Sequence, residues 1–148
     1  MANQEMIDNL SSLAQVDIDA VHAYDQAIDQ IDADDEQIRE KLIEYRQDHQ
    51  RHVAELASEI RDLGGTPPEY SRDFKGFLIE GFTALRSLTG TEGALKAMKS
   101  NEGLTNRRYD EARTWHLTGS AKGVVERGFQ DEQAHLQFIE ETLHARVG

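Results

Sequence analysis

Glu132-Gln133-Ala134-His135 places a glutamate and a histidine three residues apart, in a segment whose apolar residues recur at helical spacing. Positions i and i+3 lie on the same face of an α-helix, so these two side chains can converge on one metal ion. Read alone, the pair is a weak signal, because acidic helices contain Glu-x-x-His by chance. Its meaning depends on whether other segments of the chain supply matching ligands.

Length and composition restrict the class of protein. The chain has 148 residues, two prolines and no cysteine, which predicts one all-α domain and excludes disulfides, thiolate zinc sites and iron–sulfur clusters. A net charge of -12 argues against nucleic acid or an anionic membrane as partner. No run approaches the roughly 18 apolar residues of a membrane span, and no apolar leader follows Met1. We therefore expect a cytoplasmic protein.

Four long segments each show the three- and four-residue spacing of one buried helical stripe. Each stripe is interrupted by polar residues: Asp17 in the first helix (about 3–31), His49 and His52 in the second (about 35–63), Glu102 in the third (about 92–117), and Glu132 and His135 in the fourth (about 121–145). Asp19 lies about 200° around the helix from Asp17, so we expect it to face solvent. The pattern predicts a four-helix bundle that forms a single domain over residues 1–148.

A long connection separates the second and third helices. Gly64-Gly65 ends the second helix, and Pro67-Pro68 prevents it from continuing. A short amphipathic helix rich in phenylalanine follows at about residues 74–89. We expect this helix, Phe74–Leu88, to pack over one end or side of the bundle. A homodimer contact or a lid over a pocket is the alternative.

The two halves of the chain repeat each other at the level of polar residues. An acid precedes a tyrosine by seven residues in both halves, as Asp17 and Tyr24 and as Glu102 and Tyr109. The later helix of each half carries matching polar runs at a nearly equal offset, Asp48–His52 and Asp131–His135. The repeat predicts two α-hairpins related by a pseudo-two-fold axis, with their polar groups meeting near the centre.

This arrangement resembles the ferritin-like superfamily, and more narrowly the small bacterial ferritin-like proteins that carry the domain of unknown function DUF2383. The resemblance implies a bundle with a long crossover and a metal site in its core. The implied metal ligands are Asp17, His49, His52, Glu102, Glu132 and His135. The hydroxyls of Tyr24 and Tyr109 would hold carboxylates in place. Asp48 lies at the edge of its stripe, where it can serve as a substitute carboxylate.

Two positions depart from the ferritin-like pattern. Asp17 replaces a longer glutamate, and His49 stands where the family has a glutamate that bridges two metals. An imidazole cannot bridge through one nitrogen as a carboxylate does through its two oxygens. Three carboxylates carry a charge of -3, so one metal and two metals are both compatible with this set. Mixed nitrogen and oxygen ligands suit iron, manganese or zinc.

Two classes of function follow. The first is a metal-binding ferritin-like protein with a mononuclear or dinuclear site of iron, manganese or zinc. This class allows oxidase- or peroxidase-like activity and a role in oxidative stress. The replacement of the bridging carboxylate by His49 argues against full activity of the ferritin-like kind. The second is a metal-free structural or interaction bundle with a buried core of histidines and carboxylates. Burying carboxylates without cations costs several kcal/mol for each group, which favours the first class.

Overall fold

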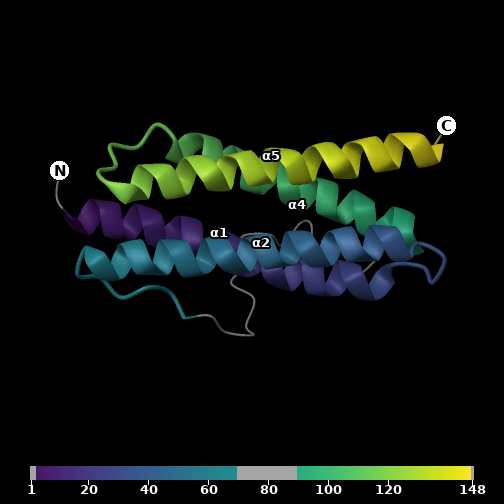
Figure 1. Ribbon diagram of the computed structural model, residues 1–148, viewed down its shortest axis with the longest axis horizontal. Helices are drawn as coiled ribbons and strands as arrows, with labels where there is room; N and C mark the ends of the chain where they lie inside the picture. The colour runs from purple at the N-terminus through teal and green to yellow at the C-terminus, as the bar shows by residue number, and fades with distance from the viewer. Residues whose placement is uncertain (1–2, 70–89, 148) are drawn as a thin grey trace.

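A computed structural model describes residues 3–69 and 90–147 of the chain, and this part contains four long helices and no strand. The helices are α1 (Asn3–Gln30), α2 (Glu36–Asp62), α4 (Gly90–Ala112) and α5 (Ser120–Val147), and they pack as a bundle (Figure 1). The predicted all-α four-helix bundle is confirmed. The predicted short helix at about 74–89, and the homodimer contact assigned to it, lie outside the described residues. None of the described helices combines the length and apolar character needed to cross a membrane.

Contacts between helix ends fix the directions of the helices. The backbone N–H of Asp32, after α1, donates to the Thr91 Oγ1 atom at the start of α4 over 2.9 Å. Ser120, at the start of α5, donates to the Glu59 carboxylate near the end of α2 over 2.7 Å. The helices α2 and α4 therefore run parallel to each other and antiparallel to α1 and α5 (Figure 1). The end of α2 and the start of α4 consequently lie at opposite ends of the bundle.

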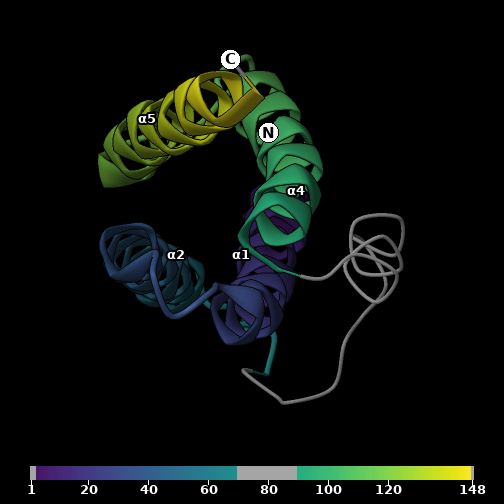
Figure 2. The ribbon, with the colours of Figure 1, turned by 90° about the vertical axis from the view of Figure 1, so that its right-hand side faces the viewer.

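The bundle has two apolar clusters with a polar layer between them. In the end-on view, α1 lies between α2 and α4, and α5 lies beside α4 and faces α2 (Figure 2). One cluster contains Ile28, Leu42, Leu95, Met98 and Ile139, and the other contains Leu10, Leu13, Leu56, Ile60 and Val125. On each of the four described helices the polar residues of the stripe fall between the members of these two clusters. The apolar clusters thus hold the polar layer in the middle of the bundle, away from both ends.

The predicted end of the second helix is confirmed, because α2 stops at Asp62 and the chain turns at Gly64-Gly65. Gly64 has a φ of 89°, a left-handed conformation that side chains disfavour. This turn lets the Gly65 N–H bond to the Ile60 carbonyl over 2.9 Å. The bond helps to satisfy the Ile60 carbonyl, because the carbonyls in the last turn of a helix lack their usual intrahelical partners.

Two expectations about the helices were wrong. The third helix ends at Ala112 rather than near Leu117. Thr114 is responsible, because its Oγ1 donates to the Glu111 carbonyl over 2.6 Å and its N–H bonds to the same carbonyl over 3.0 Å, which tightens the last turn. Asp19 is fully buried rather than solvent-facing. The reason is that α2 and α4 pack against different sides of α1, so more than one face of α1 is covered.

Candidate metal centre

The six predicted ligands come together in the polar layer, where each residue is at most 1% exposed. They form two overlapping groups, and within each group the ligand atoms lie within 4.8 Å of one another. The first group contains Asp17, His49, His52 and Glu132, and the second contains His49, Glu102, Glu132 and His135. Either group could hold a metal ion, and His49 and Glu132 belong to both.

The first group is built around the Asp17 carboxylate of α1. Its Oδ1 atom lies 2.7 Å from His49 Nδ1 and 3.1 Å from His52 Nδ1. The Tyr109 hydroxyl of α4 donates to Asp17 Oδ2 over 2.5 Å. Burial raises the pKa of Asp17, but the positive charges and hydrogen bonds of the two histidines outweigh it and lower the pKa overall.

The second group is built around the Glu102 carboxylate of α4. Its Oε2 atom lies 3.1 Å from His49 Nε2 and 3.0 Å from His135 Nδ1, and it also accepts the Tyr24 hydroxyl of α1. Thr105 Oγ1 donates to the other carboxylate oxygen over 2.6 Å. Burial raises the pKa of Glu102, but the charges of His135 and His49 pull it well below the ordinary value. Tyr24 and Tyr109 thus each bond to the carboxylate of the opposite hairpin.

Two of the three histidines are held from outside by aspartates of the facing helix. His52 Nε2 of α2 lies 2.8 Å from Asp131 Oδ2 of α5. His135 Nε2 of α5 lies 2.8 Å from Asp48 Oδ2 of α2. Metal-binding histidines usually have a carboxylate or carbonyl at the nitrogen that does not bind the metal, which fixes the ring and its tautomer. This arrangement leaves the Nδ1 atom of each ring pointing into the polar layer.

Asp131 is a site residue that the sequence argument missed. Its role could have been found from the internal repeat, because Asp131 precedes Glu132 as Asp48 precedes His49. Asp48 itself was predicted to support the site, and it contacts His135 rather than the ligand atoms of the layer. Arg51 lies over both aspartates, 2.7 Å from Asp131 and 3.4 Å from Asp48. These three half-exposed side chains close the seam between α2 and α5 above the histidines.

The carboxylates strongly favour the protonated form of the buried histidines when no cation is present. Burial lowers the pKa of His52, but the charge of Asp17 and the hydrogen bonds that the ring donates to Asp131 and Asp17 raise it to about 12. Burial lowers the pKa of His135 too, but Glu102 and Asp48 raise it to about 9. The pKa of His49 is also raised, by Glu132 and Glu102 against the effect of burial. The layer therefore attracts positive charge, whether protons or metal ions supply it.

Glu132 is the exception among the carboxylates. Its side chain is fully buried, yet neither oxygen has a hydrogen-bond partner among the described residues. Oε1 lies 3.2 Å from His52 Nδ1 and Oε2 lies 3.5 Å from His49 Nε2, at ion-pair distance but outside hydrogen-bond geometry. Burial and the neighbouring Glu102 charge raise the pKa of Glu132 to about 7, because the opposing charge of His49 does not compensate for them. A buried carboxylate without a hydrogen bond is costly, and a cation between it and the histidines would remove that cost.

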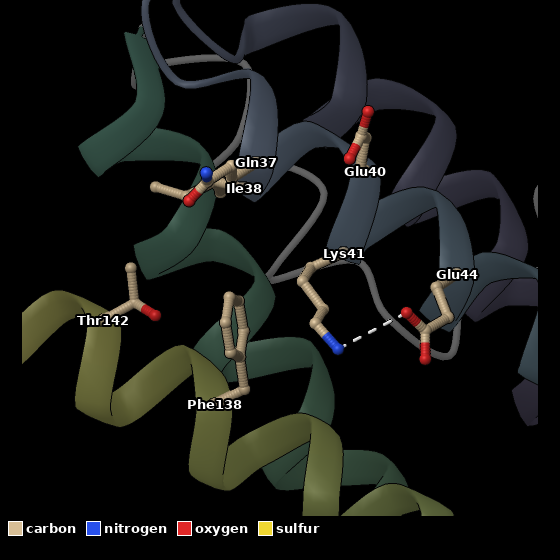
Figure 3. A pocket seen from close by; sticks show the side chains of 7 residues that line it. All are labelled: Gln37, Ile38, Glu40, Lys41, Glu44, Phe138 and Thr142. Atoms are coloured by element: carbon tan, nitrogen blue, oxygen red, sulfur yellow. Dashed lines mark hydrogen bonds and ion pairs between the residues drawn. The ribbon is translucent and has the colours of Figure 1, made fainter.

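Aromatic side chains pack differently on the two sides of the layer. Tyr45 stacks on His135 with ring centroids 4.1 Å apart, and Phe138 meets Tyr45 edge-on at 5.7 Å. Beyond Phe138 lies a surface pocket of about 440 Å³ between α2 and α5, whose polar rim includes the Lys41–Glu44 ion pair (Figure 3). Tyr45 and Phe138 therefore form an aromatic wall between the polar layer and this pocket.

Gly128 occupies the position in α5 that matches Tyr45 in the repeat. A Cβ atom at Gly128 would clash with Cε1 of the Tyr109 ring. The glycine therefore makes room for the Tyr109 ring, which carries the hydroxyl bonded to Asp17. One hairpin uses this position to stack on a histidine, and the other uses it to admit a tyrosine.

Comparison with known proteins adds the family of the chain. Residues 5–114 match the family described as Domain of unknown function (DUF2383), whereas no curated protein matches the chain. The matched region contains Asp17, His49, His52 and Glu102, and it ends before α5. The match spans most of the chain, and it agrees with the narrower resemblance seen in the sequence, to the DUF2383 proteins. The chain belongs to the DUF2383 family.

Proposed function

We propose that this protein binds divalent metal ions in the buried polar layer of a ferritin-like bundle. The observation that carries the proposal is the Glu132 carboxylate, which is fully buried and has no hydrogen bond from the described residues. It faces nitrogens of His49 and His52, which belong with it to a group that could coordinate one ion. A cation there would satisfy Glu132 and use ring nitrogens that already point inward.

The donor set fits a transition metal. Three carboxylates and three imidazoles give the mixed oxygen and nitrogen ligands that suit iron, manganese and zinc. Metal binding requires unprotonated ligands, so an ion would replace the protons that His49, His52 and His135 otherwise carry. Asp131 and Asp48 hold the outer nitrogens of two rings, which fixes the inner nitrogens toward the ions. Tyr24 and Tyr109 would keep Glu102 and Asp17 oriented in the same way.

Redox function depends on which metal is bound. Iron or manganese would supply oxidation–reduction chemistry to the layer, as expected of a protein that acts in oxidative stress, and zinc would not. The contribution of the protein chain is to exclude water from the ligands, since each is at most 1% exposed, and to hold the carboxylates by hydroxyl hydrogen bonds.

A metal-free bundle is the second candidate, and one observation favours it. The raised pKa values of His52, about 12, and His135, about 9, allow protonated histidines to neutralise the buried carboxylates. Such a core needs no ion for charge neutrality. In such a core Glu132 has no hydrogen-bond partner among the described residues, however, which is why we place metal binding first.

Metal analysis of the full chain tests the choice between the two. Protein purified without chelator, and apoprotein given anaerobic Fe(II), Mn(II) or Zn(II), should retain at least one ion per chain after gel filtration. The thermal midpoint should rise with metal concentration, because the ions bind only the folded state. The Glu132→Gln variant should lose most of this shift, whereas the His116→Gln control, at an exposed histidine outside the layer, should keep it. Absence of bound metal together with an unchanged midpoint would exclude metal binding.

A further inference from the structure

His49 differs from the other two histidines of the layer in the use of its ring nitrogens. His52 and His135 each turn one nitrogen inward and give the other to a half-exposed aspartate at the seam. Both nitrogens of His49 point into the layer. Its Nδ1 lies 2.7 Å from Asp17 Oδ1, and its Nε2 lies 3.1 Å from Glu102 Oε2. The ring is fully buried and stands between the two carboxylates.

We propose that His49 bridges two divalent metal ions through its two ring nitrogens, as an imidazolate. One ion lies on the Nδ1 edge with Asp17 and His52, and the other lies on the Nε2 edge with Glu102 and His135. Glu132 offers one oxygen to each position, since Oε1 faces His52 and Oε2 faces His49 Nε2. The inference rests on the proposed metal binding and specifies the number of ions and the group that links them.

The charges of the layer support two ions in this form. Asp17, Glu102 and Glu132 carry three negative charges, one fewer than two divalent cations require. An imidazolate at His49 adds the fourth, so the ligands and the two ions become neutral together. Each metal–nitrogen bond replaces an N–H bond of the ring, and the released protons pass to water without any electron transfer. Neutrality matters here because the layer is closed to solvent and an excess charge would be costly.

The bridge also sets the distance between the ions. Metal–nitrogen bonds of about 2.0–2.1 Å, extending from opposite edges of one ring, place the two ions roughly 6 Å apart. Two-metal sites with closely bridged ions have a separation of about 3.5–4 Å. Because His49 stands in place of a bridging glutamate, we expect the two ions to lie farther apart than in closely bridged sites. At roughly 6 Å, no single atom can bind both ions.

Anomalous diffraction from crystals of the full chain loaded with Co(II) tests the proposal directly. We expect two cobalt peaks, one at each nitrogen of His49, separated by roughly 6 Å. A pair separated by about 3.5–4 Å, or a single ion with the other His49 nitrogen still bonded to a carboxylate, would overturn the bridge while leaving metal binding intact. Absence of any cobalt in the layer would overturn the proposed function as well, so the two failures are distinguishable.

Copper provides a second measurement in solution. Two Cu(II) ions joined by an imidazolate are magnetically coupled, so the low-temperature electron paramagnetic resonance signal of wild-type protein should integrate to much less than the copper bound. In the His49→Gln variant the coupling should be lost, while the His116→Gln control should behave as the wild type. In His49→Glu, a carboxylate replaces the ring, and the Co(II) separation should shorten to about 3.5–4 Å. Uncoupled copper in the wild-type protein at two ions per chain would contradict the bridge.

Discussion

The Asp17 side and the Glu102 side of the polar layer are built by the same plan and differ at their centre. On each side a carboxylate accepts a tyrosine hydroxyl from the opposite hairpin, and a histidine is held by an aspartate of the facing helix. The central pair breaks the symmetry, because α2 contributes His49 where α5 contributes Glu132. The supporting contacts are thus duplicated while the shared ligands are not. The comparison indicates that the repeat determines the contacts that hold the ligands. The two central residues, His49 and Glu132, determine which ligand atoms the two sides share.

The two sides also differ in how firmly their carboxylates are held. Glu102 accepts hydrogen bonds from Tyr24 and Thr105, in addition to its contacts with His49 and His135. Asp17 has the shorter side chain and accepts one hydroxyl, from Tyr109. We therefore expect the loss of the Glu102 charge to destabilise the protein more than the loss of the Asp17 charge.

Neutralising Glu102 should produce the largest effect. The Glu102→Gln change leaves His49 and His135 without their shared anion, and breaking a buried ion pair typically costs about 3–5 kcal/mol. Asp17→Asn should cost less, because fewer groups depend on that carboxylate. Urea unfolding of both apoproteins measures the difference, and metal analysis should show one ion fewer per chain in each variant. Equal losses of unfolding free energy would contradict the ranking of the two sides.

Raising the pH should have the next largest effect, because it should weaken the Glu102 side of the apoprotein before the Asp17 side. The folded pKa of His135 is about 9, above the ordinary 6.5, so its contribution to apoprotein stability is complete below pH 6.5 and disappears as the pH rises through 9. The resulting decrease in the free energy of unfolding is about 3 kcal/mol at most. The pKa of His52, about 12, keeps the Asp17 side intact over the same range. Glu132, with a raised pKa of about 7, adds a further loss between pH 4.5 and 7.

Thermal melts at pH 6 and pH 9 in the presence of chelator measure this effect. The midpoint should fall at the higher pH in the apoprotein. Protein saturated with Mn(II) should show a smaller fall or a rise, because metal binding strengthens as its ligands lose their protons. An apoprotein more stable at pH 9 than at pH 6 would show that the histidines of the layer are not protonated in the folded state.

Changes to the aspartates between α2 and α5 should have the smallest effects, and they form a matched pair of variants, one for each side of the layer. Asp48→Asn removes the anion behind His135, and Asp131→Asn removes the anion behind His52. Loss of such a supporting carboxylate typically weakens metal affinity by about 10–100-fold. Competition with a coloured chelator measures it, and each change should weaken the ion on its own side. Unchanged affinity in both variants would show that these contacts serve only to join α2 and α5.

The sequence alone determined the four helices and the polar residues of their buried stripes. Helical periodicity records which face of a segment is buried, so Asp17, His49, Glu102 and His135 could be placed in one layer before any coordinates were known. The internal repeat predicted two related hairpins with their polar groups meeting near the centre, and the family resemblance implied that Tyr24 and Tyr109 hold carboxylates. Periodicity failed for Asp19, because α1 is covered on more than one face, and for the end of α4, which a local Thr114 hydrogen bond sets.

Only the tertiary structure decided how the polar groups face each other. A stripe gives the side of a helix on which a residue lies, but not its rotamer or its partner on another helix. Three features depend on those choices: the crossed contacts of Asp131 and Asp48, the Glu132 carboxylate that lacks a hydrogen bond within the described part of the chain, and the two inward nitrogens of His49. In the sequence, His49 seemed only to remove a metal bridge, whereas the orientation of its ring is the basis for our proposal that it forms one. The physical reason is that an imidazole has donors on two edges, and the fold gives each edge a different carboxylate.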